Sequence, residues 1–174
     1  NVKITYAADW SEYFQVAGGL RPLDRLWALD EIDMVGIDAY FPLTNSQNSR
    51  INVDEIKNGW NSGEGIDYYV DENNNKVTND FGDREYNQWK NLRYWWNSEH
   101  WEWDNINQKS IKTPWAPKMK PIWFTEFGFP SIDKAPNKPN VFFNPDCVDG
   151  DIPSFSTGKP DFAIQKKSLR ATLE

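Results

Sequence analysis

The segment PIWFTEF, residues 121–127, is apolar except for Thr125 and Glu126, and it is followed by Gly128 and Pro130. A short apolar run closed by glycine and proline is typical of a buried strand. We therefore expect a strand over residues 121–127 that presents the carboxylate of Glu126 at its carboxyl end.

Two segments upstream have the same organisation. Residues 2–8 (VKITYAA) and residues 32–38 (IDMVGID) are rich in β-branched and other apolar residues, which predicts two more strands. Each predicted strand delivers acidic or aromatic residues at its carboxyl end. These are Asp9 and Trp10 for the first strand, and Asp38 and Tyr40 for the second.

Helical patterns occur between and after the predicted strands. We expect helices over residues 22–29, 51–60 and 84–96. A further helix is expected after Asp161, a residue suited to capping its first turn, with Phe162, Leu169 and Leu173 on one side. Residues 45–52 and 71–83 have the polar composition of loops.

Strands that alternate with helical segments indicate an α/β fold with parallel strands, because each parallel connection needs a dozen or more residues. Asp38 and Ile122 are 84 positions apart, so an insertion is expected between the second and third strands. The chain begins at Asn1 in a strand-like segment and ends at Glu174 in a helical pattern. We expect one domain over residues 1–174, as a piece of a longer polypeptide.

The composition excludes several classes of function. The chain has 174 residues, of which 39% are hydrophobic and 26% charged, as in a soluble globular protein. Its net charge of -7 disfavours nucleic acid and anionic membranes as partners, and no apolar run is long enough for membrane insertion. A single cysteine, Cys147, and a single histidine, His100, predict neither an internal disulfide nor a metal site, and no cofactor is expected.

Aromatic residues make up 16% of the chain, including 10 tryptophans, many of them among polar residues. Flat aromatic rings stack on the apolar faces of sugars, so this content favours a carbohydrate ligand; a tryptophan-rich core under polar loops is the alternative. Residues 99–104 (EHWEWD) combine both residue types. They fit the rim of a sugar cleft or a solvated loop around buried tryptophan.

The carboxyl ends of parallel strands meet at one edge of a sheet, so the residues there are candidates for a functional site. Phenylalanines around Glu126 predict an apolar setting that tunes a catalytic carboxylate, although a buried structural glutamate is the alternative. Asp38 and Tyr40 are candidates to orient that carboxylate or to bind sugar hydroxyls. Asp9 and Trp10 are candidate contacts to a sugar hydroxyl and a sugar ring, and each of the four also fits a structural role.

Several motifs carry a family resemblance over nearly the whole chain. They are KITYAADWSEY at residues 3–13, VGIDAYFPL at 35–43, LRYWW at 92–96, Asp133-Lys134, PNVF at 139–142, and KPIWFTEFG at 120–128. Together they resemble the glycoside-hydrolase-type TIM-barrel domain of gene transfer agent and phage-tail hub proteins. That family is similar in turn to retaining glycosidases whose nucleophile is a glutamate at the end of barrel strand seven.

The resemblance implies a partial (β/α)8 barrel, approximately strands five to seven with the long insertion between six and seven. It places Glu126 in the nucleophile position and Tyr40 near a tyrosine of strand six, and we include Trp123 among the substrate-binding candidates. The general acid of such enzymes lies at the end of strand four, which would precede Asn1. A retaining mechanism is therefore expected only through the family.

Two functions follow as expectations. In the first, a phage-tail-like protein hydrolyses a cell-wall or surface polysaccharide, including peptidoglycan, with Glu126 as nucleophile. In the second, the domain is a non-catalytic structural or glycan-binding module of a baseplate, because fold does not imply function. Other tail or baseplate proteins are the expected partners, with synthesis in the cytoplasm and residence in the tail particle. A third reading, an unrelated α/β protein with Glu126 as a metal ligand, lacks paired histidine or aspartate near Glu126.

Overall fold

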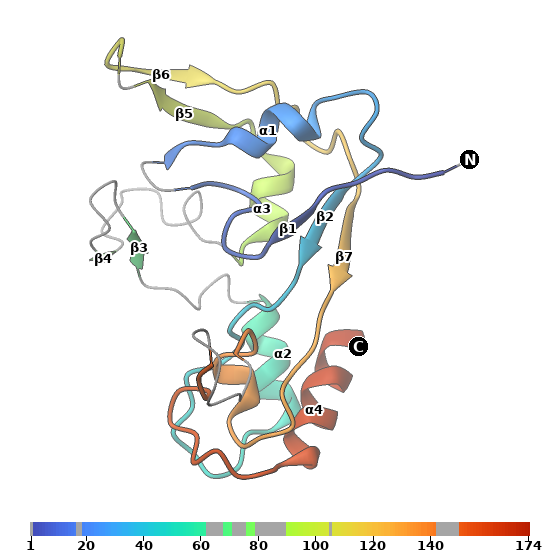
Figure 1. Cartoon of the computed structure of the whole chain (residues 1–174), viewed down its shortest axis with the longest axis vertical. Coiled ribbons are helices and arrows are strands. Elements are labelled where there is room, and N and C mark those ends of the chain that lie inside the picture. The colour runs from blue at the N-terminus through green and yellow to red at the C-terminus, as the bar shows by residue number, and fades with distance from the viewer. Residues whose placement is uncertain are drawn as a thin grey trace. The chain divides into compact units, whose positions relative to one another are not determined.

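The computed structural model describes residues 2–16, 19–61, 68–70, 76–78, 90–104, 106–141 and 150–174. They form two compact units, drawn in Figure 1, which are described separately below. Unit 1 comprises Asn1–Ala39 and Ile66–Glu126, and unit 2 comprises Tyr40–Gly65 and Phe127–Glu174. The expected single domain over residues 1–174 stays a prediction.

The strands and helices follow one another along the chain in a mixed order. Unit 1 contains β1 (Ala7–Asp9), α1 (Pro22–Trp27), β2 (Val35–Asp38), β3 (Tyr68–Val70), β4 (Lys76–Thr78), α3 (Leu92–Asn97), β5 (Trp101–Asp104), β6 (Lys109–Lys112) and β7 (Ile122–Glu126). Unit 2 contains α2 (Val53–Asn61), the 3-10 helix η2 (Ala135–Asn137) and α4 (Phe162–Leu173).

A parallel sheet organises unit 1, with the strand order β1-β2-β7 (Figure 1). The predicted α/β fold with a parallel sheet is confirmed, and the described strands form no closed barrel. The middle strand β2 is buried at Val35, Gly36 and Ile37. The expectation that the third strand is also buried is wrong, because β7 is an outer strand and exposes its side chains from Trp123 to Glu126.

The long interval between β2 and β7 holds an insertion, as predicted, with two antiparallel hairpins, β3-β4 and β5-β6, in unit 1. The helix expected over residues 84–96 differs at its described end. Asn91 accepts a hydrogen bond from the amide of Tyr94, so it caps a helix that begins only at Leu92. Residues 81–89 lie outside the described residues.

The lone histidine belongs to the core of unit 1. Nδ1 of His100 lies 3.0 Å from Oδ2 of Asp24 and its Nε2 lies 2.7 Å from the carbonyl oxygen of Trp95, so both ring nitrogens face acceptors. The ring stacks on Trp115, and Thr113 donates to Asp24 at 2.6 Å. This buried network joins α1 to the start of β5 and the end of β6.

A second polar contact ties the β5-β6 hairpin to α1. The buried carboxylate of Glu102 accepts hydrogen bonds from the guanidinium of Arg25 and from the backbone amide of Arg21. The hydrogen bond from Arg25 holds the pKa of Glu102 below its usual value. The side chain of Glu102 therefore points into unit 1, whereas its neighbours Trp101 and Trp103 are exposed.

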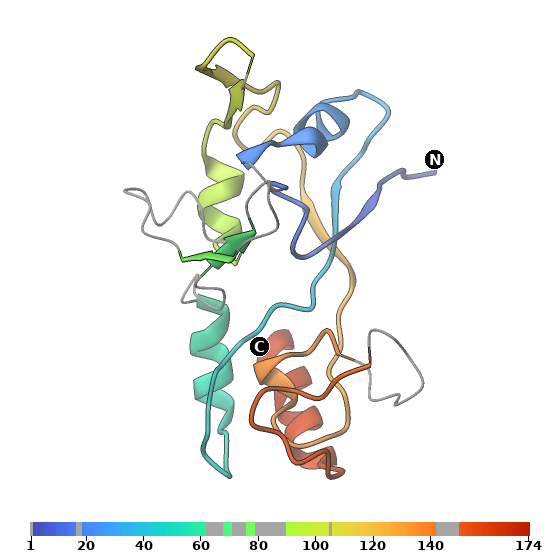
Figure 2. The ribbon, with the colours of Figure 1, turned by 60° about the vertical axis from the view of Figure 1, so that its left-hand side comes forward.

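In unit 2, α2 packs against α4, and Figure 2 shows the two helices from the side. Nε1 of Trp60 donates to the hydroxyl of Thr172 at 3.1 Å. Asn137, a buried residue of η2, connects two loops of unit 2. Its side-chain amide donates to the carbonyl oxygens of Ser46 and Ser154 at 3.0 and 2.8 Å. Hydrogen bonds from a side-chain amide to backbone carbonyl groups fix loops, because loop backbone has no partners in a helix or a sheet.

The buried face of α4 differs from the expected one. Asp161 caps the helix as predicted, with its carboxylate accepting from the amide of Ile164 at 2.9 Å. However, Phe162 and Leu173 are 70% and 75% exposed. The helix buries Ile164, Ser168 and Ala171 instead. Small residues on this face allow close packing, which an apolar stripe of large residues would prevent.

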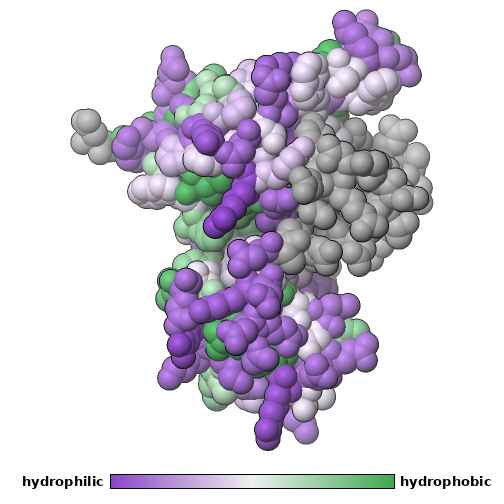
Figure 3. All heavy atoms as spheres, turned by 180° about the vertical axis from the view of Figure 1, so that it is seen from behind, coloured by the Kyte–Doolittle hydropathy of each residue, from purple (hydrophilic) through white to green (hydrophobic). Residues whose placement is uncertain are grey.

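The face drawn in Figure 3 carries mostly hydrophilic side chains with hydrophobic groups between them. Within the described part of the chain, no helix is both long and apolar enough to cross a membrane.

The close contact between Gly59 of α2 and the backbone of Leu43 can be tested by substitution. A Cβ at this position would lie 1.8 Å from the carbonyl oxygen of Leu43, so alanine forces the loop and helix apart. Overpacking costs about 1–3 kcal/mol, more than the ~1 kcal/mol that alanine gains in helix propensity. We expect Gly59→Ala to lower the urea midpoint of unfolding, and the exposed Asn58→Ala, on the same helix, not to lower it. Equal midpoints for the two variants would contradict this packing.

The Glu102 contact predicts a pH-dependent contribution to stability. Because its folded pKa is below the unfolded value of 4.5, the contribution is present above about pH 4.5 and is lost as the pH falls through the folded pKa. We expect Glu102→Gln to cost roughly 1–3 kcal/mol at neutral pH and progressively less as the pH falls below 4.5 and through the folded pKa. Denaturant unfolding at several pH values measures this, with the exposed Glu31→Gln as control. A constant difference across the pH range would refute it.

Candidate active site at the carboxyl edge of the sheet

Three carboxylates stand in a row at the carboxyl edge of the parallel sheet. Asp9 of β1 is the register partner of Asp38 of β2, and Asp38 is the register partner of Glu126 of β7. Neighbouring strands lie about 4.8 Å apart, so the row spans roughly 10 Å between the outer two backbones. The expectation that these acidic residues meet at one edge is confirmed. We call Asp9, Asp38 and Glu126 the acidic row.

A β-bulge forms the β7 side of the acidic row. Ile37 pairs with Phe124, but Asp38 pairs with Glu126, so Thr125 is the extra residue of β7. The pairing continues beyond the bulge, where the amide of Ala39 donates to the carbonyl oxygen of Glu126 at 2.7 Å. Bulges often occur next to active sites, where they re-aim side chains.

The bulge gives Asp38 a hydrogen-bond donor. The hydroxyl of Thr125 donates to Oδ1 of Asp38 at 2.7 Å. One oxygen of Asp38 is thereby held in a fixed direction, and the carboxylate is only partly exposed. Asp38 is therefore an oriented acceptor in the middle of the row.

Asp9 takes part in the turn that follows β1. Its Oδ1 accepts from the amide and the hydroxyl of Ser11, at 2.8 and 2.5 Å. Its carbonyl oxygen accepts from the amides of Glu12 and Tyr13 at 2.9 and 3.0 Å. These contacts fix the local turn and engage Oδ1 of the carboxylate.

Glu126 differs from its expected environment. The sequence predicts an enclosed carboxylate among phenylalanines, but Glu126 is exposed and the adjacent Phe124 is partly exposed. The expectation is wrong because β7 is an outer strand, and no other described strand covers its free edge.

The three aromatic candidates, Trp123, Trp10 and Tyr40, differ in their exposure and in the unit to which they belong. Trp123 is 56% exposed on β7, with Gly36 as its register partner, so much of its ring is available for stacking. Trp10 is buried in unit 1. Tyr40 belongs to unit 2, where a Cβ on Gly128 would lie 3.7 Å from its ring. Only Trp123 of these three is described as an exposed ring on the sheet itself.

Two exposed tryptophans form a second aromatic surface on the β5-β6 hairpin. Trp101 and Trp103 are 43% and 44% exposed and alternate with the buried Glu102, so they share one face of β5. A loop around buried tryptophan is therefore wrong for residues 99–104, since His100 and Glu102 are buried and the two tryptophans are exposed. The rim of a sugar cleft stays a prediction.

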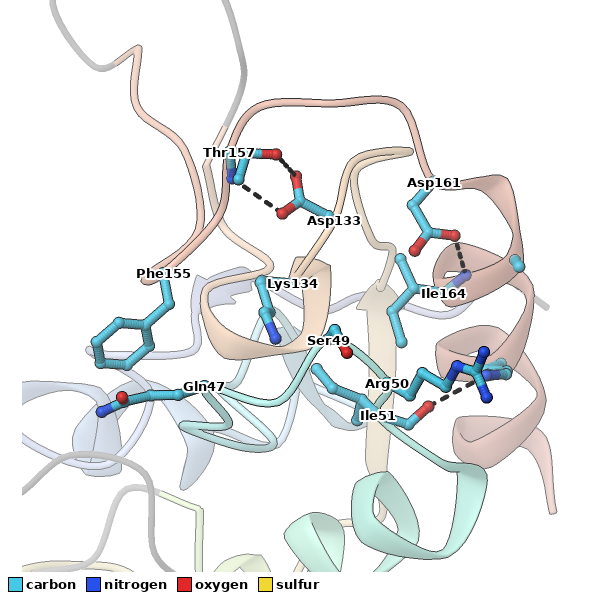
Figure 4. Close-up of a pocket in the computed structure, with 12 residues that line it drawn as sticks. Gln47, Ser49, Arg50, Ile51, Asp133, Lys134, Phe155, Thr157, Asp161 and Ile164 are labelled. Carbon is cyan, nitrogen blue, oxygen red and sulfur yellow. Dashed lines mark hydrogen bonds between the residues drawn. The ribbon is translucent and has the colours of Figure 1, made fainter.

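Sequence reasoning missed a pocket of about 370 Å³ within unit 2, drawn in Figure 4. It lies among loops and the first turns of α4, where no periodic pattern marks it. A pair of adjacent charged residues, Asp133 and Lys134, was its one signal in the sequence. Among the described residues, no three histidine, cysteine, aspartate or glutamate side chains are placed to hold a metal ion.

Comparison with known proteins gives one family. Its model, described as the GTA TIM-barrel-like domain, matches residues 1–174. A search of curated proteins finds no match. A parallel sheet with helical connections and functional candidates at its carboxyl edge fits a TIM-barrel-like domain. The chain belongs to the GTA TIM-barrel-like domain family.

Proposed function

We propose that the chain is part of a glycoside hydrolase of a phage-tail-like or gene-transfer-agent particle, acting on a cell-wall or surface polysaccharide. The observation that carries this proposal is the acidic row, with Glu126 in register with Asp38 at the carboxyl edge of parallel strands. In TIM-barrel enzymes the catalytic residues come from the carboxyl ends of the strands. We assign β1, β2 and β7 to barrel strands five, six and seven.

In the proposed mechanism, Glu126 attacks the anomeric carbon as a carboxylate. The glycosidic bond breaks, the departing oxygen takes a proton from a second carboxylic acid, and a glycosyl ester forms on Glu126; water then hydrolyses the ester. The second group must lie about 5–5.5 Å from Glu126 in a retaining enzyme. We assign it to strand four, in the polypeptide before Asn1.

The neighbours of Glu126 suit binding roles. Asp38 already accepts a hydrogen bond from Thr125, so it serves as an acceptor that orients a sugar hydroxyl rather than as the acid. Oδ2 of Asp9 serves a second hydroxyl. The exposed ring of Trp123 stacks on a sugar face. Trp10, which is buried, and Tyr40, which belongs to unit 2, stay predictions and have no role in this mechanism.

The first test removes the nucleophile. Glu126→Gln keeps the size of the side chain at an exposed position, and the melting temperature of the variant is measured alongside its activity. In the intact protein we expect reducing-end release from peptidoglycan or bacterial polysaccharide to fall on the order of 10²–10⁴-fold, as for removal of a catalytic acid or base. The matched control is Glu12→Gln, an exposed glutamate in the turn after β1. Equal rates of reducing-end release for Glu126→Gln and the parent would refute the assignment of Glu126 as the nucleophile.

Trp101 and Trp103 favour a second candidate function, a glycan-binding module without turnover. Two exposed rings on one face of a hairpin provide a flat platform for sugars. A binding function does not require a second catalytic carboxylic acid to act together with Glu126. It fits a baseplate component that attaches a particle to a cell surface.

The second candidate predicts binding without hydrolysis. We expect Trp103→Ala to weaken retention in affinity electrophoresis through polysaccharide gels by roughly two- to tenfold, the effect of losing one stacking ring. Ile106→Ala, which truncates an exposed apolar residue 92% open to solvent near the same hairpin, serves as control. Retention that is unchanged by Trp103→Ala would exclude the platform.

A further inference from the structure

The pocket of unit 2 encloses an unusual lysine. Lys134 is only 8% exposed, and its ammonium nitrogen is buried without a hydrogen-bond partner among the described residues. Lys134 lines the pocket, and in Figure 4 its side chain is drawn between Phe155 and Ser49. Burying an ammonium group is costly unless an anion or several acceptors compensate it. Lys134 thus requires a partner that the described protein does not supply.

The carboxylates that line the pocket are already engaged. Asp133 accepts from the hydroxyl of Ser156, from the amides of Thr157 and Lys159, and from the Thr157 hydroxyl. Burial opposes its ionisation, but these hydrogen bonds hold the pKa of Asp133 below the usual value. Asp161 caps α4. Both acids therefore support the local backbone rather than the ammonium of Lys134.

Two more cations line the same pocket. They are Arg50, which is exposed, and Lys167, whose ammonium donates to the carbonyl oxygen of Ile51 at 3.2 Å. With Lys134 they outnumber the two engaged carboxylates. In a chain of net charge -7, this local excess of cations marks a place suited to an anion.

The rest of the lining suits a sugar ring. Phe155 is half exposed beside Gln47 in Figure 4, so it presents a stacking face next to an amide. Ser49 adds a hydroxyl near Lys134. A volume of about 370 Å³ lies in the range of small-molecule sites. The lining thus offers a flat ring, an amide and a hydroxyl around one buried cation.

We propose that this pocket binds an acidic sugar residue, with its anionic group on Lys134 and its ring on Phe155. The choice of a sugar as the ligand rests on the proposed function, whereas the need for an anion rests on Lys134 alone. The pocket would then give the protein a preference for polysaccharides that carry carboxylates.

The test uses the intact protein with glucuronate, glucose and inorganic phosphate as probes in isothermal titration calorimetry. We expect glucuronate to bind and glucose to bind at least about tenfold more weakly, because a charged hydrogen bond is lost. Lys134→Met should weaken glucuronate by a similar factor without lowering the melting temperature, since it removes an unpaired buried charge. Phe155→Ala, at a half-exposed site, should weaken glucuronate severalfold. Lys166→Met, an exposed lysine on α4, is the matched control and should bind as the parent.

Several results would overturn the proposal. They are absence of glucuronate binding, equal affinity for glucose and glucuronate, and unchanged affinity in Lys134→Met. Phosphate binding as tight as glucuronate, with no effect of Phe155→Ala, would reduce the pocket to a simple ion site. Glu126→Gln should leave glucuronate binding intact. A failure of the hydrolysis assay is therefore distinguishable from a failure of this proposal.

Discussion

The parallel pairing of β2 with both of its neighbours is the constraint on which the candidate site depends. A parallel register carries all strand ends to the same edge, so the last residues of β1, β2 and β7 become neighbours although they are far apart in sequence. Side chains alternate between the faces of a strand, and a slip of one residue would move Asp38 to the opposite face. The buried residues Val35 and Ile37 oppose such a slip, because it would expose them.

Much of this arrangement is predictable from sequence. Short apolar runs that end in Asp9, Asp38 and Glu126 identify where the three strands end, but not where they begin: β1 covers only Ala7–Asp9 and β2 only Val35–Asp38 of the longer predicted runs. Local chemistry also identifies the start of α1 at Pro22 and the cap of α4 at Asp161. These features depend on a few consecutive residues, and sequence patterns report such features well.

Other features depend on contacts that no local pattern records. The exposure of Glu126 follows from the position of β7 in the sheet, not from the phenylalanines around it. The buried residues of α4, Ile164, Ser168 and Ala171, are set by the packing of the helix in unit 2 and not by its largest apolar side chains. The pocket around Lys134 is assembled from loops whose contacts are set by tertiary structure. The side chain of Asn91 caps α3 at Leu92, a helix start that the spacing of apolar residues did not indicate.

The bulge at Thr125 has a consequence for how the site tolerates change in length. Without the extra residue, a regular ladder would still place the glutamate opposite Asp38, since Phe124 already pairs with Ile37. The insertion therefore leaves the carboxylate where it is and adds a hydroxyl beside Asp38. Phe124 and Glu126 thus keep the opposite faces of the sheet that their partners Ile37 and Asp38 occupy. The site therefore accommodates one residue of added length in β7 without moving its carboxylate to the other face.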